Sequence, residues 1–275
     1  SRAFIKVWDI SNREKPVLKR NISLDGNYIN SRMIGEYVYV VMESHIYFEN
    51  NEVILPELRY GEQQVEVIPA SAIYYCNVSD YSYRFTTILA INVQNDEQEP
   101  SNLTVLLGAT SCMYVSLDNI YLTVSSSYHG DMTEQTSIYR IHLEDNGLEL
   151  VASGAVPGSV LNQFSMDEYN SYFRIATTTG HIARTLEQAT SKNHIYVLNP
   201  DLTIVGELND LASGEKIYSA RFMGDRCYLV TFRKVDPLFV IDLKNPNQPK
   251  VLGELKITGY SDYLHPYYEN YVIGI

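Results

Sequence analysis

Short runs in which apolar and polar residues alternate recur along the whole chain, each about as long as a β-strand. This period-two pattern, rich in Tyr, Val, Ile and Thr, predicts half-buried strands rather than helices. The runs form a repeat, because residues 4–10 followed by Pro16 resemble residues 238–243 followed by Pro249. In both copies an aspartate stands seven residues before the proline, and a glycine follows ten residues after it. The chain is therefore built from a repeated unit.

Three more copies lie between these two, and the first strand of each copy ends in a polar residue. The residues in this column are Asp9, Asn92, His142, Asn199 and Asp242. A short polar side chain suits a turn there, because it can hydrogen-bond the backbone that follows. Each unit continues with a second strand and then a hairpin with an acidic or Gly-containing turn, such as Gly35-Glu36 or Gly224-Asp225. Five units of four short strands predict an all-β fold, a β-propeller of four-stranded antiparallel blades.

The order of strands within the unit leaves two arrangements open. The chain begins with the outer pair of strands and ends with the inner pair, so residues 260–275 can pair with residues 4–23 and close a five-bladed ring. Alternatively, the five units are an arc of a larger propeller whose open edges favour self-association. We treat residues 1–275 as a single propeller domain or fragment, with an inter-blade insertion at 43–85 and a shorter one at 178–193.

The insertion at residues 43–85 carries an aromatic patch. Its members are Tyr74, Tyr75, Tyr81 and Tyr83. Long insertions in a repeat emerge on one face and often carry binding residues. We favour a loop held onto the propeller by its own aromatic side chains, and a ligand or glycan platform is the alternative.

When the inner hairpins of the units are aligned on their turns, one strand position carries a polar residue in four of them. The residues at this position, which we call the axis column, are Arg32, Tyr114, Arg221 and His265. Equivalent positions in a propeller form a ring about its axis, so the column predicts a ligand-binding ring for carboxylates or sugar hydroxyls. We favour the alternative that each arginine pairs with an acidic turn residue, such as Glu36, Asp225 or Asp167, and joins neighbouring blades. Asp167 and its neighbour Glu168 are assigned to a surface turn, pointing to opposite faces.

Four motifs, at residues 26–35, 160–169, 217–226 and 263–267, resemble a family of archaeal and bacterial secreted proteins. That family carries a C-terminal β-propeller domain distantly related to WD40 repeats. The resemblance implies an exported or surface-anchored protein whose propeller extends beyond both ends of this chain, and it supplies no reaction. Tyr268 departs from the family pattern, which more often has an acidic residue there.

Composition and spacing argue against several classes of function. A net charge of -12 and a pI near 4.9 disfavour a nucleic-acid partner. Three cysteines without a CxxC pair and six histidines without metal-ligand spacing predict neither a metal site nor a cofactor. No apolar run is long enough for a transmembrane segment. Three glycosylation sequons, at Asn21, Asn77 and Asn102, are compatible with export.

These observations favour a non-catalytic, extracytoplasmic binding or interaction scaffold whose partner is a protein or a cell-surface glycan. An enzyme is the less favoured alternative, because the sequence contains no catalytic signature. It would be a carbohydrate-active hydrolase or lyase with a site at the propeller axis, where Arg32, Arg221 and His265 bind the substrate. A purely structural cell-envelope module is the third hypothesis.

Overall fold

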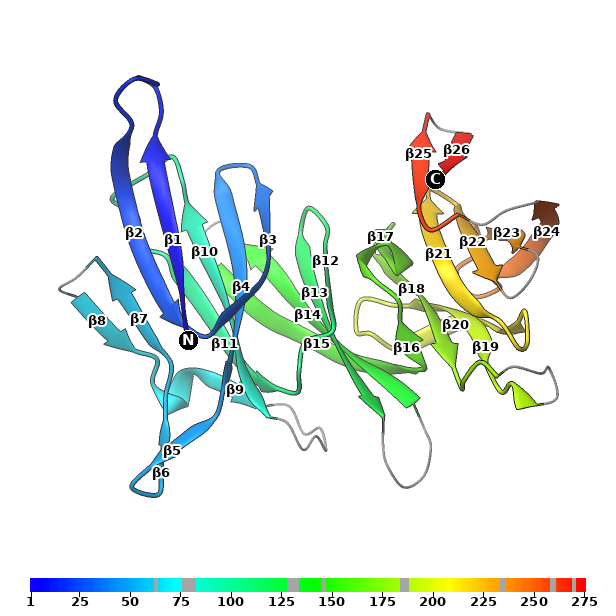
Figure 1. Cartoon of the computed structure of the whole chain (residues 1–275), viewed down its shortest axis with the longest axis horizontal. Helices are drawn as coiled ribbons and strands as arrows, with labels where there is room; N and C mark the ends of the chain where they lie inside the picture. Colours follow the sequence, from blue (N-terminus) through cyan, green and yellow to red (C-terminus); the bar gives the residue numbers. More distant parts are fainter. Residues whose placement is uncertain are drawn as a thin grey trace. The chain divides into compact units, whose positions relative to one another are not determined.

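The computed structural model describes residues 1–61, 64–75, 83–127, 134–144, 147–183, 188–232, 236–257, 261–268 and 271–275. Among these residues, every element is a β-strand except two short 3-10 turns, η1 (Ala70–Ala72) and η2 (Gln163–Ser165) (Figure 1). The all-β prediction is therefore confirmed. The strands form two compact units, residues 1–110 with 142–149 and residues 111–141 with 150–275.

The first unit contains two sheets and a separate hairpin. The first sheet has the order β1 (Arg2–Asp9), β2 (Val17–Asp25), β7 (Glu57–Tyr60), β8 (Gln64–Val67). The second has the order β3 (Asn27–Ile34), β4 (Tyr37–His45), β10 (Arg84–Asn92), β11 (Ser101–Leu107), β9 (Ile73–Tyr75). The separate hairpin pairs β5 (Tyr47–Glu49) with β6 (Glu52–Ile54).

The described part of the insertion, residues 43–61, 64–75 and 83–85, contains strands that belong to these sheets, whereas the sequence favoured a loop. Its strand β7 pairs antiparallel with β2, with Leu58 opposite Leu24, and its strand β9 runs parallel to β11. Both additions satisfy backbone groups that would otherwise lie at a sheet edge. The apolar core of this unit joins residues of β2, β4 and β10, among them Ile22, Met42 and Leu89.

The second unit contains three larger sheets in chain order, followed by a hairpin. The first sheet comprises β12 (Cys112–Val115), β13 (Asn119–Ser127), β14 (Glu134–Glu144) and β15 (Gly147–Pro157). The next comprises β16 (Ser159–Val160), β18 (Tyr172–Thr179), β19 (Lys192–Leu198) and β20 (Ile204–Leu211), with β17 (Met166–Tyr169) also paired to β18. The third comprises β21 (Lys216–Met223), β22 (Arg226–Phe232), β23 (Asp236–Asp242) and β24 (Lys250–Ile257). The final hairpin pairs β25 (Leu264–Tyr267) with β26 (Tyr271–Gly274).

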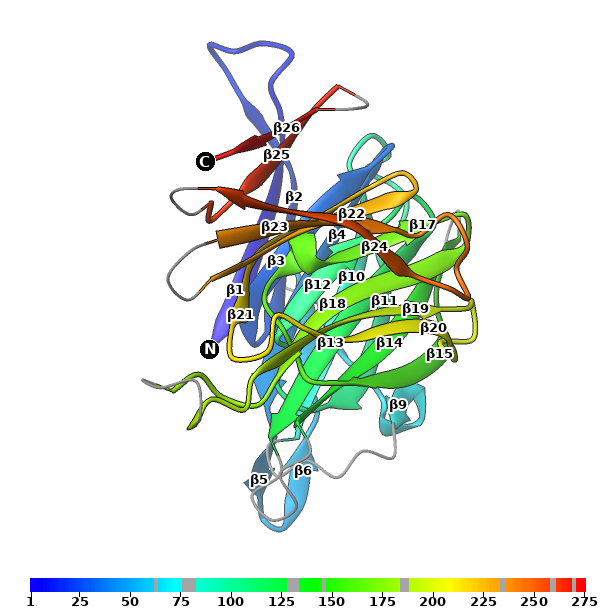
Figure 2. The same ribbon diagram turned by 90° about the vertical axis from the view of Figure 1, so that its right-hand side faces the viewer.

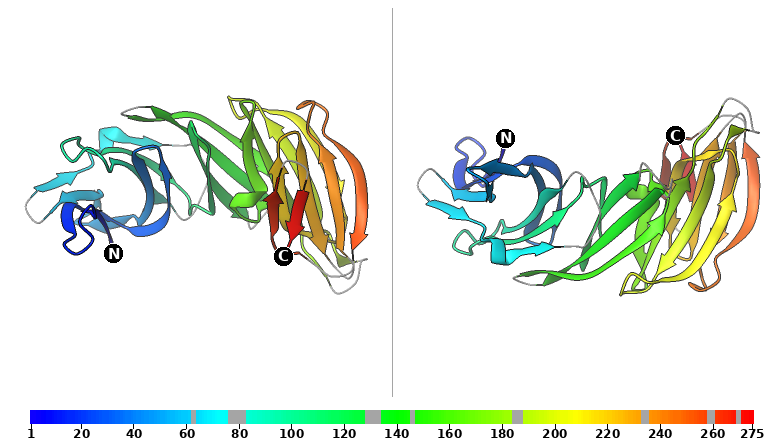
Figure 3. Two further views of the ribbon diagram at one scale, coloured as in Figure 1. Left: turned by 90° about the horizontal axis from the view of Figure 1, so that it is seen from above. Right: turned by 90° about the horizontal axis from the view of Figure 1, so that it is seen from below.

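Consecutive sheets of the second unit pack face to face (Figures 2 and 3). One core cluster joins Ile195 and Val197 of β19 to Phe222, Cys227 and Leu229 of the next sheet. Another joins residues of β13 and β14 to residues of β18 and β19. Four-stranded antiparallel sheets stacked on their apolar faces are the arrangement of propeller blades, so the propeller-like fold agrees with the prediction.

The predicted pairing of residues 260–275 with residues 4–23 is not among the strand pairings of the described residues. There β25 and β26 form a two-stranded sheet, and the sheet of β1 and β2 continues through β7 and β8. Closure of a five-bladed ring therefore stays a prediction.

The structure shows the predicted hydrogen bond to the backbone of the following turn for four of the five polar residues that end the first strands. At each of the four, the side chain accepts a hydrogen bond from the backbone N–H two residues later. The bonds are Ser11 to Asp9 at 2.9 Å, Gln94 to Asn92 at 2.9 Å, Asp201 to Asn199 at 3.1 Å, and Lys244 to Asp242 at 3.0 Å. The hairpin glycines Gly35 and Gly224 have φ of 56° and 51°. Positive φ is the conformation for which the hairpin turns require glycine.

Candidate functional site

The axis column is divided between the two units. Arg32 lies in β3 of the first unit and is exposed. Tyr114 in β12, Arg221 in β21 and His265 in β25 belong to the second unit. The structure thus allows only the last three to be compared with one another.

Arg221 lies among aromatic side chains. Its Nη2 donates a hydrogen bond to the hydroxyl of Tyr263 at 3.1 Å. Its guanidinium carbon is 4.6 Å from the ring centre of Phe164 and 5.5 Å from that of Tyr263. The Tyr263 hydroxyl is also 3.4 Å from Nδ1 of His265. We call these four residues, Phe164, Arg221, Tyr263 and His265, the Arg221 cluster.

Local structure places each member of the Arg221 cluster. Phe164 is the middle residue of η2, a turn that begins where the Asn162 side chain accepts a hydrogen bond from the Phe164 N–H at 2.9 Å. Tyr263 precedes β25 and is held by its backbone carbonyl, which accepts from the Ile275 N–H at 2.9 Å. Phe164 and Tyr263 meet edge to face, with ring centres 5.1 Å apart, a favourable arrangement for two aromatic rings.

The Arg221 cluster can bind an acceptor. Arg221 forms no ion pair with a carboxylate among the described residues, and its buried Nε has no hydrogen-bond partner there. This differs from the acidic turn partner that the sequence favoured for each arginine. A guanidinium held between aromatic faces keeps its charge and its fork of donors, which match a carboxylate. His265 is exposed beside it and carries a second polar group.

Tyr114 takes part in a different network. Its hydroxyl accepts a hydrogen bond from the Glu168 N–H at 3.2 Å and lies 3.5 Å from Oδ1 of Asp167. Burial, followed by the charge of Asp167, raises the pKa of Tyr114 to about 12. This hydroxyl therefore joins two sheets and does not bind within the Arg221 cluster.

Arg174 is an arginine that joins neighbouring sheets, and the sequence analysis missed it. It lies in β18 and is 2% exposed. Its Nε donates to Oδ2 of Asp167 at 3.0 Å, its Nη2 also contacts that oxygen, and its Nη1 donates to the carbonyl of Gly224 in the next sheet at 2.6 Å. An arginine inside an otherwise apolar strand was the available signal, because a buried charge requires a partner.

The assignment of Asp167 and Glu168 to a surface turn is wrong. Both are half-buried in strand β17. They do point apart, since Asp167 binds Arg174 while Glu168 accepts hydrogen bonds from Ser116 at 2.6 Å and from Asn119 at 3.0 Å. Strand alternation explains the divergence. Asp167 is covered by Arg174 of the adjacent strand, whereas the partners of Glu168 come from the neighbouring sheet.

The aromatic patch of the insertion is only partly described. Tyr74 and Tyr75 lie in β9 and are 45% and 62% exposed. As neighbours on a strand they point to opposite faces, so they do not share one surface. Tyr83 is half-buried, and Tyr81 lies outside the described residues.

The predicted glycosylation sites and the cysteines differ in burial. Asn21 in β2 and Asn102 in β11 are half-buried, and Asn77 lies outside the described residues. Cys227 is fully buried, and burial raises the pKa of its thiol to about 12. Cys112 is half-buried.

The described part of the chain shows neither a cluster of metal ligands nor a helix that could span a membrane. No group of three or more His, Cys, Asp or Glu side chains there is arranged to hold a metal ion. In the same residues, no helix has the length and apolar character needed to cross a membrane.

Comparisons with known proteins match this chain to a protein family, to archaeal relatives and to a solved structure. A family model described as a beta propeller domain matches residues 1–275. An uncharacterized protein from Methanocaldococcus jannaschii is 54% identical over 147 residues, covering 54% of this chain and 23% of that protein. An uncharacterized protein from Archaeoglobus fulgidus is 46% identical over 140 residues, covering 50% of this chain and 21% of that protein. The matches therefore span less than a quarter of the length of these relatives.

A solved structure of acylaminoacyl peptidase in complex with Z-Gly-Gly-Phe-chloromethyl ketone has a TM-score of 0.42 and 9% sequence identity to this chain. The alignment covers 86% of this chain and 33% of the peptidase.

Proposed function

The chain belongs to the beta propeller domain family, and from that premise we propose that it is a non-catalytic binding scaffold for a protein or glycan that carries carboxylates. The Arg221 cluster is the observation that carries this proposal. It combines a guanidinium without a carboxylate partner among the described residues with aromatic walls from Phe164 and Tyr263.

Binding follows from the geometry of the guanidinium. Arg221 presents planar N–H donors, which bind a carboxylate in a bidentate fork. Phe164 and Tyr263 lie against the guanidinium, so the side chain loses little rotamer freedom when the ligand arrives. His265 provides a further polar group for a neighbouring hydroxyl or carboxylate.

The test is an array of glycans and peptides, with neutral and carboxylate-bearing members in both classes. We expect retention of members that carry uronic acids, sialic acid or acidic side chains. Arg221→Ala should weaken the retained ligand about tenfold to a hundredfold, because a hydrogen bond to a charged group contributes about 1.5–3 kcal/mol.

Arg226→Ala is the matched control for this experiment. Arg226 lies in the paired strand β22 and is exposed, so its removal changes the net charge equally without touching the Arg221 cluster. We expect it to bind like the unaltered protein. A uniformly blank array, or an equal loss of binding in both variants, would refute the proposal.

We also propose that the five units are an arc of a larger propeller outside the cytoplasm, related to WD40 repeats and C-terminal in its parent protein. Support comes from the sheets: β19 and β23 are each flanked by strands on both sides, whereas the equivalent strand β1 is an edge strand. The family resemblance of the motifs supports the compartment. Native mass spectrometry tests the arc, since an open edge should associate, and a monomer at high concentration would favour the closed ring.

A further inference from the structure

One position of the repeat contacts the neighbouring sheet, and its residue differs in the first sheet. The strand pairings place four residues at equivalent sites, each opposite the residue that stands two positions before the polar end of a first strand. They are Arg20 opposite Val7, Ser101 opposite Ala90, Gly206 opposite Val197 and Gly253 opposite Val240, so the residue is small in every one of these sheets but the first. Gly206 packs directly on the outer turn of the next sheet, because a Cβ there would lie 2.0 Å from the carbonyl oxygen of Pro246. A small residue therefore lets a sheet contact the next turn closely.

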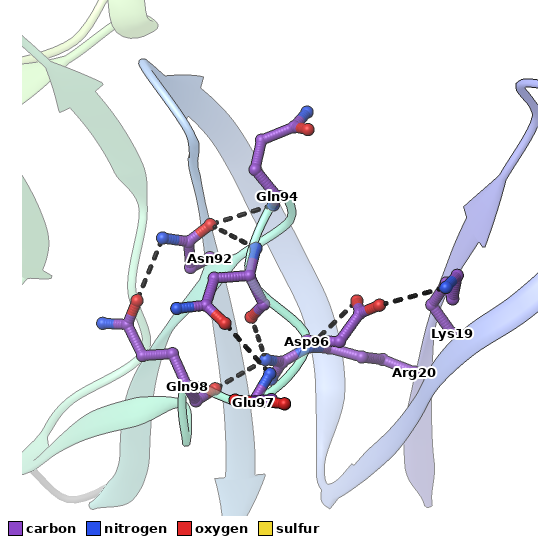
Figure 4. Close-up of polar contacts among 8 residues, drawn as sticks. Lys19, Arg20, Asn92, Gln94, Asp96, Glu97 and Gln98 are labelled. Atoms are coloured by element: carbon purple, nitrogen blue, oxygen red, sulfur yellow. Dashed lines mark hydrogen bonds and ion pairs between the residues drawn. The ribbon is translucent and has the colours of Figure 1, made fainter.

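Arg20 holds the equivalent turn at a distance. Its side chain is 8% exposed, and its Nη2 donates to the carbonyls of Asn95 and Gln98, the latter at 2.6 Å (Figure 4). The turn itself is fixed, since Asn92 accepts from the Gln94 N–H and donates from its side chain to Gln98 at 2.9 Å. Where Gly206 allows direct contact, the length of the arginine side chain leaves space between the first sheet and the turn.

That space consists of two clefts that share one ion pair. The clefts have volumes of 390 Å³ and 310 Å³, within the roughly 300–1,000 Å³ of small-molecule sites. Lys19 and Asp96 line both clefts, and their ammonium and carboxylate groups are 3.5 Å apart. Trp8 and Gln94 also line the larger cleft, and Tyr60 lines the smaller one.

The lining favours a ligand with many hydroxyl groups and no net charge. Carboxylate, amide, ammonium and guanidinium groups together supply both acceptors and donors. The cations Lys19 and Arg20 largely offset the carboxylates that line the two clefts, which are Asp9, Asp96 and Glu99. An aromatic residue lines each cleft, and an aromatic face packs on the apolar side of a sugar ring. Arg20 contributes to the same charge network, because its buried Nε lies 4.0 Å from Oδ1 of Asp96.

We propose that this double cleft binds a neutral oligosaccharide of at least two sugar units, one in each cleft. The site lies in the first unit and shares no residue with the Arg221 cluster. It goes beyond the proposed function, because it would hold even if the Arg221 cluster bound nothing.

The sole tryptophan of the chain makes the test specific. Trp8 is 49% exposed and lines the larger cleft, so its fluorescence reports directly on occupancy. The purified chain is titrated with four neutral disaccharides, cellobiose, N,N'-diacetylchitobiose, lactose and mannobiose, and with glucuronate as the charged comparison. We expect a saturable change in emission with at least one disaccharide and none with glucuronate.

Asp96→Asn is the decisive variant, with Glu97→Gln as its control. Asp96 lines both clefts, whereas Glu97 lies in the same turn and lines neither. Both changes remove one negative charge from an exposed position, so both proteins should keep their melting temperature. We expect at least about a tenfold weaker affinity for Asp96→Asn and an unchanged affinity for Glu97→Gln.

Three results would overturn the proposal: no saturable change with any of the four disaccharides, equal affinities for Asp96→Asn and the unaltered chain, or a preference for glucuronate. Arg221→Ala is included as a separate arm, since it should leave the Trp8 signal intact. Its outcome keeps failure of this site distinct from failure of the Arg221 cluster.

Discussion

Replacing Arg174 by methionine should strongly destabilise the second unit. The substitution keeps an apolar stem close to that of arginine but removes the charge that binds Asp167 and the donor that reaches the Gly224 carbonyl at 2.6 Å. Asp167 would be left half-buried without its cation, and the carbonyl without its partner. The variant thus isolates the polar role of Arg174 from its packing role.

The expected magnitude follows from these lost contacts. Breaking a buried ion pair costs about 3–5 kcal/mol, and the lower end applies here because the Asp167 side chain is 22% exposed. Loss of the bond to Gly224 adds about 1 kcal/mol. A total near 4 kcal/mol should lower the melting temperature by roughly 8–16 °C for a unit of this size.

Thermal unfolding followed by circular dichroism measures this effect, and a double-mutant cycle assigns it. Asp167→Asn alone should destabilise, and its combination with Arg174→Met should cost clearly less than the sum of the two single changes. Arg226→Met is the matched control, because Arg226 is exposed in the neighbouring sheet. A loss below about 1 kcal/mol for Arg174→Met, or strict additivity in the cycle, would refute the role of Arg174.

Three further predictions concern packing and titration. Gly206→Ala should lower the free energy of unfolding in urea by about 1–3 kcal/mol, because the added Cβ would meet the Pro246 carbonyl. Gly253→Ala has open space at its Cβ and should change that free energy by less than about 1 kcal/mol. Similar effects of the two changes would contradict the direct sheet contact. Cys227 should resist alkylation at pH 9 in the folded protein and react once urea unfolds it, because burial raises its pKa to about 12. Peptide mapping separates Cys227 from the other two cysteines, and rapid labelling of Cys227 itself in the native protein would contradict this. Burial also raises the pKa of Tyr114 and Tyr196 from 10.0 to about 12, so the stability that these neutral phenols contribute below pH 10 should be lost as the pH approaches 12. Phenolate absorbance that rises before the circular dichroism changes would count against this link between ionisation and unfolding.

Local patterns made much of the fold predictable from the sequence. Asp9, Asn92 and Asp242 hydrogen-bond backbone groups two residues ahead, so the residue type and its place after a strand suffice to identify each turn. Gly35 and Gly224 likewise show the positive φ that their hairpins require. Features that depend on a few neighbouring residues are therefore the ones that sequence reasoning identified.

Contacts between distant segments could not be derived in the same way. β7 pairs with β2 across more than thirty residues of chain, and either of two sheet edges could have received the inserted strand. Arg174 reaches Gly224 in the following sheet, a distance in sequence that no local pattern encodes. The candidate site shows the same limit, because the column identified Arg221 but not its neighbour Phe164, which comes from η2.

In a repeat protein, then, a binding site is best sought where one position departs from its column. The shared features of the units maintain strands, turns and sheet contacts, and these needs are the same in every copy. Arg20 departs from two equivalent glycines and replaces direct contact with a cleft. Arg221 shares its residue type with Arg32 of its column but departs in its contacts, because it lies against aromatic rings and not beside the acidic turn residue expected there. Each departure gives up packing or ion pairing that would stabilise the fold, and such losses are typical of positions that serve binding.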